Sequence, residues 1–362
     1  MPEKRARIAF VGCGFHATCC LYPCIPFSQE TDLVAVCDLD EKLAEGHARR
    51  FGGLRHYSDY KIMLDKEELD GVIIVSSPQV HVEIGLACLS RGIPILVEKP
   101  TATKLLDAAS LVNAAEENNT FGMTAFMKRY ATSYVIAKEC TERPSFGDIK
   151  LVDVKYSCGP YEGIWDIEES GKSFLVGNAI HMCDLVQHFA GRTTEVYAKR
   201  VVVSPAQECF AATVSFDSGA IGSLSLSCAG QWENFTEGLT LSGDGELIAV
   251  DDVMTTRYYK KEAWVNSDSR SVYSNEKPWE DIPGSRSAIN IYNAHSPTGS
   301  MPIRSNQSLV LWGYQAEIDN FARSCLGLEK PRATLADGYR ALALSLAIWE
   351  STTAGKPVNV AS

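Results

Sequence analysis

A glycine-rich motif near the N-terminus combines residues that could bind a nucleotide. Residues 12–17 read Gly-Cys-Gly-Phe-His-Ala and follow a short apolar run, so they fit the pattern G-x-G-x-x-A. In that pattern the first glycine permits a tight turn and the second lets the backbone approach a pyrophosphate. The small third residue allows close packing of a helix, whose N-terminus attracts the anion. The motif predicts a dinucleotide site, although glycines also end strands for structural reasons alone.

A carboxylate stands at the end of the second apolar run, 24 residues after Gly14. Asp38 could accept hydrogen bonds from an adenosine ribose, and it would repel a 2′-phosphate. The next residues, Leu39 and Asp40, supply no compensating arginine. We therefore predict NAD rather than NADP as the cofactor. Alternatively, Asp38 or Asp40 caps the following helix, and Asp40 fits that role better.

The triplet Glu98-Lys99-Pro100 closes a later apolar run. Ligands of open α/β sheets bind outside the carboxyl ends of the strands. A lysine there could hydrogen-bond a substrate hydroxyl and share its proton, with burial and nearby charges setting its pKa. A solvated turn is the alternative interpretation of the same triplet.

The elements that must position these residues alternate in the first third of the chain. Runs that are apolar on both faces are typical of strands in a covered parallel sheet. Such runs occupy residues 7–11, 33–37, 71–75 and 93–97, and helical stretches occupy 41–51, 80–91 and 103–118. Repeated strand–helix–strand units predict a doubly wound parallel sheet in an α/β domain.

The pattern changes after about residue 125. Strands are expected at 149–157, 195–203, 209–217, 220–229 and 239–242, and helices at 176–189, 309–325 and 335–351. Consecutive strands with short turns predict an antiparallel sheet, so the second domain is α+β. The polar stretch 251–308 contains Trp264, Trp279, Tyr292 and His295. It could be a lid, an arm that reaches a partner or a plain surface excursion.

Composition and charge narrow the class of protein. The 362 residues are 45% hydrophobic and 22% charged, as in a soluble globular protein of two or three domains. The 34 basic and 45 acidic residues give a net charge of −11, which disfavours nucleic acid and anionic membranes as partners. No apolar run approaches the roughly 18 residues of a membrane span, and no signal peptide is recognisable. A cytoplasmic location is therefore expected.

The sequence contains twelve cysteines, and they form no paired C-x-x-C motif. We expect reduced and mostly buried thiols that behave as small hydrophobic residues. A zinc site is the alternative, and no metal is predicted.

Together these residues resemble the glucose–fructose oxidoreductase/inositol dehydrogenase (Gfo/Idh/MocA) family. The resemblance is carried by Gly12, Gly14, Asp38, Ser77, Pro78, His81, Glu98, Lys99, Pro100, residues 126–130 and 179–185, Gly313, Tyr314, Glu317, Phe321, Asp337, Gly338 and residues 341–351. It covers nearly the whole chain except residues 251–308, and Glu-Lys-Pro after a dinucleotide fingerprint is its most specific part.

The resemblance implies an N-terminal Rossmann dinucleotide-binding domain over residues 1–125. It implies a C-terminal α+β domain over residues 126–334 with a large, mostly antiparallel sheet, and a last helix, 335–355, that packs back near the first domain. The sheet often serves as an oligomer interface, so a homo-oligomer, dimer or tetramer, is expected. The active site lies between the domains. The implied chemistry is hydride transfer between NAD and a secondary alcohol or ketone of a sugar, inositol or related polyol.

The resemblance also assigns roles to individual positions, with Lys99 and His181 as the catalytic pair. The residues expected at the cofactor are Gly12, Gly14, Phe15, His16, Asp38, Ser76, Ser77, Pro78, His81, Glu98 and Lys99. The residues expected at the substrate are Lys99, Phe126, Lys128, Tyr156, Trp165, Asn178 and His181. Several aromatic residues of this set, and Tyr161 beside them, could stack on a sugar face or belong to the core.

One position departs from the family pattern. Many polyol-oxidising members carry an aspartate four residues before the histidine, where this chain has Gly177. His181 then acts alone or another acid substitutes. Asp184 lies within reach on the same helix, but a structural role is expected for it.

Two other functions stay open. One is glycoside oxidation at a ring carbon such as C3, with tightly bound and recycled NAD. The other is a regulator that binds NAD or sugar without turnover, against which the retention of Lys99 and His181 argues.

Overall fold

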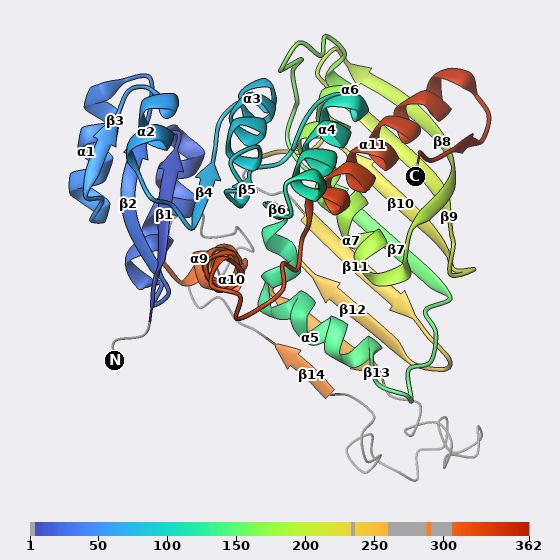
Figure 1. Cartoon of the computed structure of the whole chain (residues 1–362). Coiled ribbons are helices and arrows are strands. Elements are labelled where there is room, and N and C mark those ends of the chain that lie inside the picture. Colours follow the sequence, from blue (N-terminus) through green and yellow to red (C-terminus); the bar gives the residue numbers. More distant parts are fainter. Residues whose placement is uncertain (1–3, 233–235, 260–286, 291–305, 362) are drawn as a thin grey trace, which may run out of the picture.

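The computed structural model describes residues 4–232, 236–259, 287–290 and 306–361 (Figure 1). These residues form two sheets that lie side by side. The six-stranded sheet belongs to the N-terminal part of the chain, and the nine-stranded sheet belongs to the C-terminal part.

The smaller sheet is parallel throughout, with the strand order β3-β2-β1-β4-β5-β6. Its strands are β1 (Ala6–Val11), β2 (Thr31–Cys37), β3 (Arg55–Tyr57), β4 (Gly71–Ile74), β5 (Ile95–Val97) and β6 (Gly122–Thr124). The helices between them are α1 (Glu41–Phe51), α2 (Tyr60–Lys66), α3 (Pro78–Leu89) and α4 (Leu105–Glu117). Strands β4, β5 and β6 are buried along their whole length, as expected of a sheet covered by helices. The predicted doubly wound parallel sheet is confirmed.

The segment after the glycine motif is helical from Phe15 to Phe27, so the predicted helix is confirmed, although its winding is not α-helical throughout. The chain winds into a π-helix, η1 (Ala17–Leu21), and then a 3₁₀-helix, η2 (Tyr22–Phe27). Pro23 and Pro26 lack the N–H groups that an α-helix needs, which explains the change of winding.

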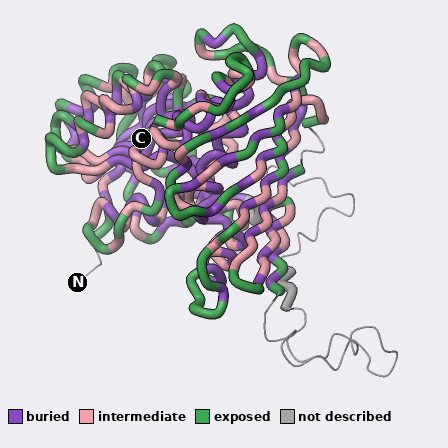
Figure 2. Tube along the Cα trace, turned by 90° about the vertical axis from the view of Figure 1, so that its right-hand side faces the viewer, coloured by how far each residue is buried: buried purple, intermediate pink, exposed green. Residues whose placement is uncertain are grey.

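The larger sheet has the strand order β14-β13-β12-β11-β7-β10-β9-β8-β15, and among the described strands only β7 and β10 pair in parallel. Its strands are β7 (Leu151–Ser157), β8 (Thr193–Ser204), β9 (Gln207–Phe216), β10 (Ile221–Ser227), β11 (Thr236–Ser242), β12 (Leu247–Asp251), β13 (Thr255–Tyr259), β14 (Ser287–Asn290) and β15 (Val358–Asn359). Burial alternates along the central strands, and Figure 2 shows this alternation. The predicted, mostly antiparallel sheet is confirmed.

The helices of the C-terminal part of the chain pack against this sheet, against one another or against the N-terminal part. They are η3 (Met127–Tyr130), α5 (Thr132–Thr141), α6 (Ser170–Gly177), α7 (Ile180–Ala190), α9 (Asn306–Leu311), α10 (Tyr314–Cys325) and α11 (Leu335–Ala354). Of these, α5, α6, α7 and α11 contact strands of the larger sheet, whereas α10 contacts β1, η1 and η2 of the first part. Helix α11 contacts α4 and β6 of the first part as well as α7 and β8 of the second (Figure 1).

Two helices that the sequence predicts as continuous are broken. The helix expected over 176–189 is two helices, because the chain leaves helical geometry at Asn178 (φ −130°). The helix expected over 309–325 breaks at Gly313, whose φ is +96°. A Cβ at that glycine would lie 2.2 Å from the carbonyl oxygen of Met127, so only glycine fits. The first break lies between Gly177, the last residue of α6, and His181 in the first turn of α7.

The stretch 251–308 is partly regular. Strands β13 and β14 extend the larger sheet at one edge, so the expectation of an irregular excursion is wrong for these residues. Residues 260–286 and 291–305 lie outside the described residues. The four aromatic and histidine residues that the sequence singles out fall there: Trp264, Trp279, Tyr292 and His295.

All twelve cysteines lie in the described part of the chain, and none forms a disulfide. Eight are buried, as predicted. Within the described ranges no three His, Cys, Asp or Glu residues are grouped to hold a metal ion. No helix of the described part has the length and apolar character needed to cross a membrane.

Candidate active site

The glycine motif forms an open loop at the carboxyl end of β1. Gly12 has φ +103°, and a Cβ there would lie 2.0 Å from the carbonyl oxygen of Val75, so glycine is required for β1 and β4 to end side by side. Gly14 is exposed, and no atom lies within 4 Å of the position of a Cβ. Phe15 beside it is 72% exposed. The loop therefore leaves open backbone for a ligand to approach.

Asp38 borders this loop. Its Oδ2 accepts a hydrogen bond from the backbone N–H of Cys13 at 2.7 Å, and its Oδ1 accepts one from the N–H of Asp40 at 2.9 Å. A carboxylate has about four acceptor sites, so capacity remains for a ligand's hydroxyls. Asp40, in turn, caps α1 by accepting from Lys42 and Leu43, as predicted. Open backbone beside a half-buried carboxylate is an arrangement that fits the pyrophosphate and ribose of NAD.

The loop after β4 carries Ser76 and Ser77, followed by Pro78 at the first turn of α3. Ser76 is exposed and Ser77 is half-buried, and the Ser77 side chain makes no capping hydrogen bond. His81 is buried, and both of its ring nitrogens are engaged: Nε2 accepts from the N–H of Ser76 at 3.0 Å, and Nδ1 lies 3.1 Å from the carbonyl oxygen of Pro100. Burial lowers the pKa of His81 to about 4, which keeps it neutral. The ring ties the loop after β4 to the loop after β5, and contact of His81 with the cofactor stays a prediction.

Glu98 and His16 form an ion pair at the base of the candidate site. Glu98 is buried, and its Oε1 lies 2.9 Å from His16 Nε2. Its Oε2 accepts the backbone N–H of Lys99 at 2.9 Å. Burial alone raises the pKa of Glu98, but His16 and Lys99 together hold it below its usual value. Burial opposes the charge on His16, yet Glu98 raises the pKa of that imidazole above its ordinary value. Both residues are expected at the cofactor: His16 follows β1 and the glycine loop, and Glu98 follows β5.

Lys99 reaches from β5 to the C-terminus of α6. Its Nζ donates a hydrogen bond to the carbonyl oxygen of Gly177 at 3.0 Å. The last carbonyls of a helix have no intrahelical partner and attract cations, so the break after α6 creates this contact. Burial lowers the pKa of Lys99, although Glu98 opposes the shift. The lysine is therefore anchored, half-buried and easier to deprotonate than a surface lysine.

His181 lies in the first turn of α7, four residues after Gly177. It is buried, and its Nδ1 has no hydrogen-bond partner among the described residues. Burial lowers the pKa of His181 well below its ordinary value, and the positive charges of Lys99, Lys128 and His16 lower it further. A neutral imidazole beside an anchored lysine is the combination that general base catalysis needs.

Five other residues are expected at the substrate, and among them Phe126 and Tyr156 are buried. Phe126 is fully buried, with its ring edge-on to His181 at 6.0 Å between centroids. Tyr156 is buried against Phe174. Contact of these two residues with a substrate stays a prediction from the resemblance. Asn178 is half-buried at the break between α6 and α7.

Lys128 is buried and paired with the carboxylate of Glu237 on β11. The hydroxyl of Tyr134 donates to the other oxygen of Glu237 at 2.8 Å. Burial and the nearby charge of Lys99 lower the pKa of Lys128. Because its ammonium group is engaged by Glu237, Lys128 shapes the electrostatics around His181 more than it offers a free ligand contact.

An ion-pair network behind the site was missed by the sequence reasoning. Arg129 is buried and makes a bidentate pair with Asp184 at 2.6 and 2.8 Å, and it lies 3.2 Å from Asp337 of α11. The structural role expected for Asp184 is confirmed, since the pair fixes α7 to η3 and α11. The dipeptide Lys128-Arg129 was the only signal in the sequence.

Glu317 was also not assigned a role beyond the resemblance. It is fully buried on α10, and neither carboxyl oxygen has a hydrogen-bond partner in the described part of the chain. Burial raises the pKa of Glu317 well above its usual value, and Glu98 raises it further. A protonated carboxyl group therefore lies behind the His16–Glu98 pair without adding a second negative charge.

Trp165 lies in the loop between β7 and α6. Trp165 and Asp166 both have positive φ angles, 55° and 62°, between the bridged residues Ile164 and Ile167, a pattern typical of a type I′ turn. Gln79 of α3 donates to the carbonyl oxygen of Trp165 at 3.3 Å and to Asp166 at 3.1 Å. This loop therefore connects the second part of the chain to the edge of the cofactor loop.

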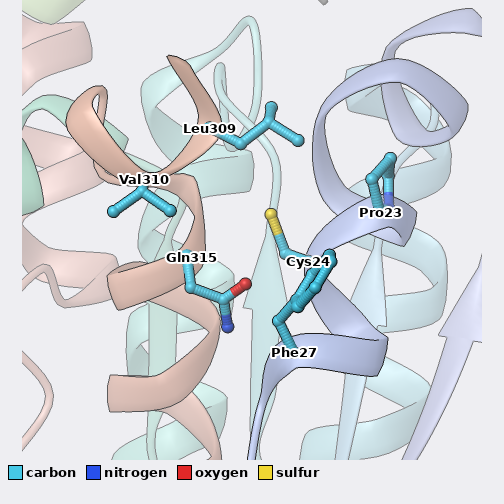
Figure 3. Close-up of a pocket in the computed structure, with 6 residues that line it drawn as sticks. All are labelled: Pro23, Cys24, Phe27, Leu309, Val310 and Gln315. Atoms are coloured by element: carbon cyan, nitrogen blue, oxygen red, sulfur yellow. The ribbon is translucent and has the colours of Figure 1, made fainter. Parts of the chain in front are cut away.

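A separate surface pocket lies between η2 and the α9–α10 turn. Its lining is mostly apolar and consists of Pro23, Cys24, Phe27, Leu309, Val310 and Gln315 (Figure 3). None of the residues expected at the cofactor or substrate lines it, so it does not belong to the site around Lys99.

A two-domain chain with a parallel dinucleotide-type sheet, an open glycine loop and a buried lysine–histidine pair defines the class of Rossmann-fold oxidoreductases. Comparison with known families specifies it further. Residues 6–126 match the sequence model described as "Oxidoreductase family, NAD-binding Rossmann fold", and residues 138–360 match "Oxidoreductase family, C-terminal alpha/beta domain". The chain belongs to the Gfo/Idh/MocA oxidoreductase family, and its N-terminal domain is the NAD-binding domain of that family.

Individual relatives are distant. Over 188 residues the chain is 27% identical to inositol 2-dehydrogenase 2 of Saccharopolyspora erythraea, and this match covers 51% of the chain and 54% of that protein. Over 170 residues it is 27% identical to levoglucosan dehydrogenase of Pseudarthrobacter phenanthrenivorans, and this match covers 45% of the chain and 44% of that protein. The chain thus spans about half the length of these curated relatives.

A solved structure extends the likeness of the fold to nearly the whole chain. An oxidoreductase from Agrobacterium radiobacter, in complex with NAD+, L-tartaric acid and magnesium, superimposes with a TM-score of 0.78. The superposition covers 98% of both chains at 18% sequence identity. At that identity the likeness shows the shared two-domain fold.

Proposed function

We propose that this protein is an NAD-dependent dehydrogenase that acts on a secondary alcohol or ketone of a sugar, an inositol or a related polyol. The single observation that carries the proposal is the anchoring of Lys99 on the Gly177 carbonyl beside a buried, neutral His181. The named activities of the two distant relatives, on inositol and levoglucosan, support the substrate class.

The cofactor site consists of the glycine loop, Asp38 and the serines after β4. Asp38 and the exposed backbone at Gly14 hold the ribose and the pyrophosphate, respectively. Ser77 is half-buried at the start of α3, and its side chain makes no capping hydrogen bond, so it would be available to the bound cofactor. When bound, NAD supplies the acceptor or donor of the hydride. The fixed Glu98–His16 pair keeps this floor of the site rigid.

Lys99 and His181 divide the work on the substrate. Lys99 donates a hydrogen bond to the reacting oxygen and stabilises negative charge as it develops there. His181, neutral at physiological pH, takes the hydroxyl proton during oxidation and returns it during reduction. Burial of both groups strengthens their interactions with the reacting atoms.

The direct experiment measures NADH formation by the purified protein with myo-inositol, levoglucosan, free sugars and alkyl glycosides. We expect at least one member of this panel to be oxidised. NADH binding without any oxidation contradicts the dehydrogenase and supports a regulator. Oxidation confined to glycosides, with NAD that co-purifies and is not released, supports the alternative of glycoside oxidation with recycled NAD.

Cofactor selectivity follows from Asp38. We expect NADH to bind at least about tenfold more tightly than NADPH, because the 2′-phosphate meets a carboxylate without a compensating arginine. Replacing Asp38 by Ser should narrow this difference, whereas Asp32→Ser, at an exposed site on β2, the strand that Asp38 follows, should leave it unchanged. Fluorescence titration gives both dissociation constants. Equal affinity in the wild-type protein contradicts the assignment.

We also propose that the open face of the larger sheet joins copies of this chain into a homo-oligomer. Val201, Val203 and Ile221 lie on this face and are 64%, 59% and 58% exposed. Light scattering should give a dimer or tetramer, and Val201→Glu with Ile221→Glu should shift it towards the monomer by burying charge at the interface. A monomeric wild-type protein at micromolar concentration excludes this interface. A cytoplasmic location stays a prediction from the sequence.

A further inference from the structure

Residue 177 has no room for a side chain, because the hydroxyl of Tyr161 occupies that place. A Cβ built on Gly177 would lie 2.3 Å from Tyr161 Oη and 3.1 Å from Trp165 Cζ3. The first distance is shorter than any that real Cβ atoms show. The carbonyl oxygen of the same glycine accepts the hydrogen bond from Lys99 Nζ. The Tyr161 hydroxyl therefore lies beside the residue that anchors Lys99.

The ring of Tyr161 is held by contacts on several sides. Its backbone N–H donates to the carbonyl oxygen of Ala206 at 2.9 Å. Its ring lies edge-on to Phe174 and tilted against Trp232, with centroid distances of 6.1 Å to each. Trp232 Nε1 donates to the carbonyl oxygen of Pro160 at 3.1 Å, which fixes the preceding residue as well. The hydroxyl is thus presented by a packed loop rather than by a free side chain.

This hydroxyl has hydrogen-bonding capacity to spare. The Tyr161 hydroxyl makes no hydrogen bond with the described residues. It is also not fully buried, whereas His181 Nδ1 is both unpartnered and fully buried. Burial, reinforced by Cys158, raises the pKa of Tyr161 to about 12, so the phenol stays protonated at neutral pH. A neutral phenol can donate one hydrogen bond and accept another.

We propose that Tyr161 is a substrate-binding residue whose hydroxyl hydrogen-bonds the substrate oxygen next to the reacting carbon. The inference rests on the proposed function, since Lys99 and His181 define which carbon reacts. Lys99 holds one oxygen and Tyr161 holds its neighbour. The site then selects ring compounds with two vicinal oxygens, and the neighbouring oxygen is a neutral hydroxyl or ether.

The kinetic test compares wild type, Tyr161→Phe and the control Tyr197→Phe, at a half-exposed tyrosine on β8. With myo-inositol or levoglucosan as substrate, Tyr161→Phe should raise KM about three- to tenfold, the scale of one neutral hydrogen bond. Its kcat and its affinity for NADH should change less than twofold, because the contact is present in ground state and transition state alike. A deoxy analogue that lacks the neighbouring hydroxyl should be discriminated by the wild type and not by Tyr161→Phe. An unchanged KM in Tyr161→Phe, with an active wild type, overturns the inference.

A stability test checks the placement without any substrate. Gly177→Ala should lower Tm in the wild-type background, and the loss should shrink in Tyr161→Phe, because the atom nearest the new methyl group is gone. Purely additive effects of the two substitutions overturn the inference. A wild-type protein that oxidises none of the panel contradicts the proposed function separately. In that case, a smaller loss of Tm in the Tyr161→Phe background supports the placement of Tyr161 beside Gly177, and equal losses of Tm in both backgrounds reject it.

Discussion

Replacing Lys99 by Met should lower turnover by about 100-fold or more, the scale of general acid–base catalysis, while NADH affinity changes little. Methionine keeps the apolar stem but removes the ammonium group that Gly177 anchors at 3.0 Å. The reacting oxygen then loses its charged donor in a site where burial strengthens such a contact. The measurement is kcat from NADH absorbance, with the NADH dissociation constant from fluorescence.

Two further variants sharpen this test. Lys104→Met removes an exposed lysine that makes no capping hydrogen bond at the start of α4, and it should behave as wild type. Lys99→Arg keeps the charge but not the geometry of a compact donor, so it should recover only part of the activity. Near-normal turnover in a folded Lys99→Met protein would show that the lysine only stabilises the end of α6.

The parallel sheet could be predicted from the sequence because its strands are apolar on both faces. Runs such as 71–75 carry that signal without reference to the rest of the chain. The strands β3 and β6 have three residues each, too few for a pattern. The helix breaks at Asn178 and Gly313 depend on packing instead. Gly313 is fixed by the carbonyl oxygen of Met127, which is 186 positions away along the chain.

The candidate site also contains residues that short motifs predict and residues that only packing brings together. The glycine loop, Asp38 and Lys99 are short motifs at strand ends, and the sequence is enough to propose them. The residues that tune the site come from distant segments: Lys128 with Glu237, Arg129 with Asp184, and Tyr161 against Gly177. A single sequence carries no record of such contacts. His81 also has a role that its motif position does not indicate, since its ring nitrogens engage Ser76 and Pro100 and so join two loops.

The structure also changes how the missing acid at position 177 is interpreted. An aspartate there, one turn before His181, would raise the pKa of the histidine. Tyr161 fills that space with a neutral hydroxyl, and the charges that face His181 are the positive ones of Lys99, Lys128 and His16. The local environment thus favours a neutral imidazole. Gly177→Asp is a poor test of His181, because the new side chain collides with Tyr161.

His181→Asn should remove most of the oxidation activity together with the acid limb of its pH profile. The base must be neutral to accept a proton, and burial and the neighbouring positive charges lower the pKa of His181 well below 6.5. Activity governed by this group is therefore fully present at neutral pH. It falls only as the pH drops through the lowered pKa, so the wild-type limb should lie below pH 6.5.

The measurement is kcat/KM for the best sugar of the panel between pH 4.5 and 9, with circular dichroism as a check on folding. His56→Asn, at an exposed histidine on β3, is the control and should keep the wild-type profile. His181→Asn should lose at least about 100-fold at neutral pH, the lower range for loss of a general base, and its residual rate should be flat on the acid side. A wild-type limb above pH 7 contradicts the neutral imidazole derived from burial. An active His181→Asn protein with the wild-type limb removes His181 from the reaction and leaves Lys99, with its lowered pKa, as the group that takes the proton.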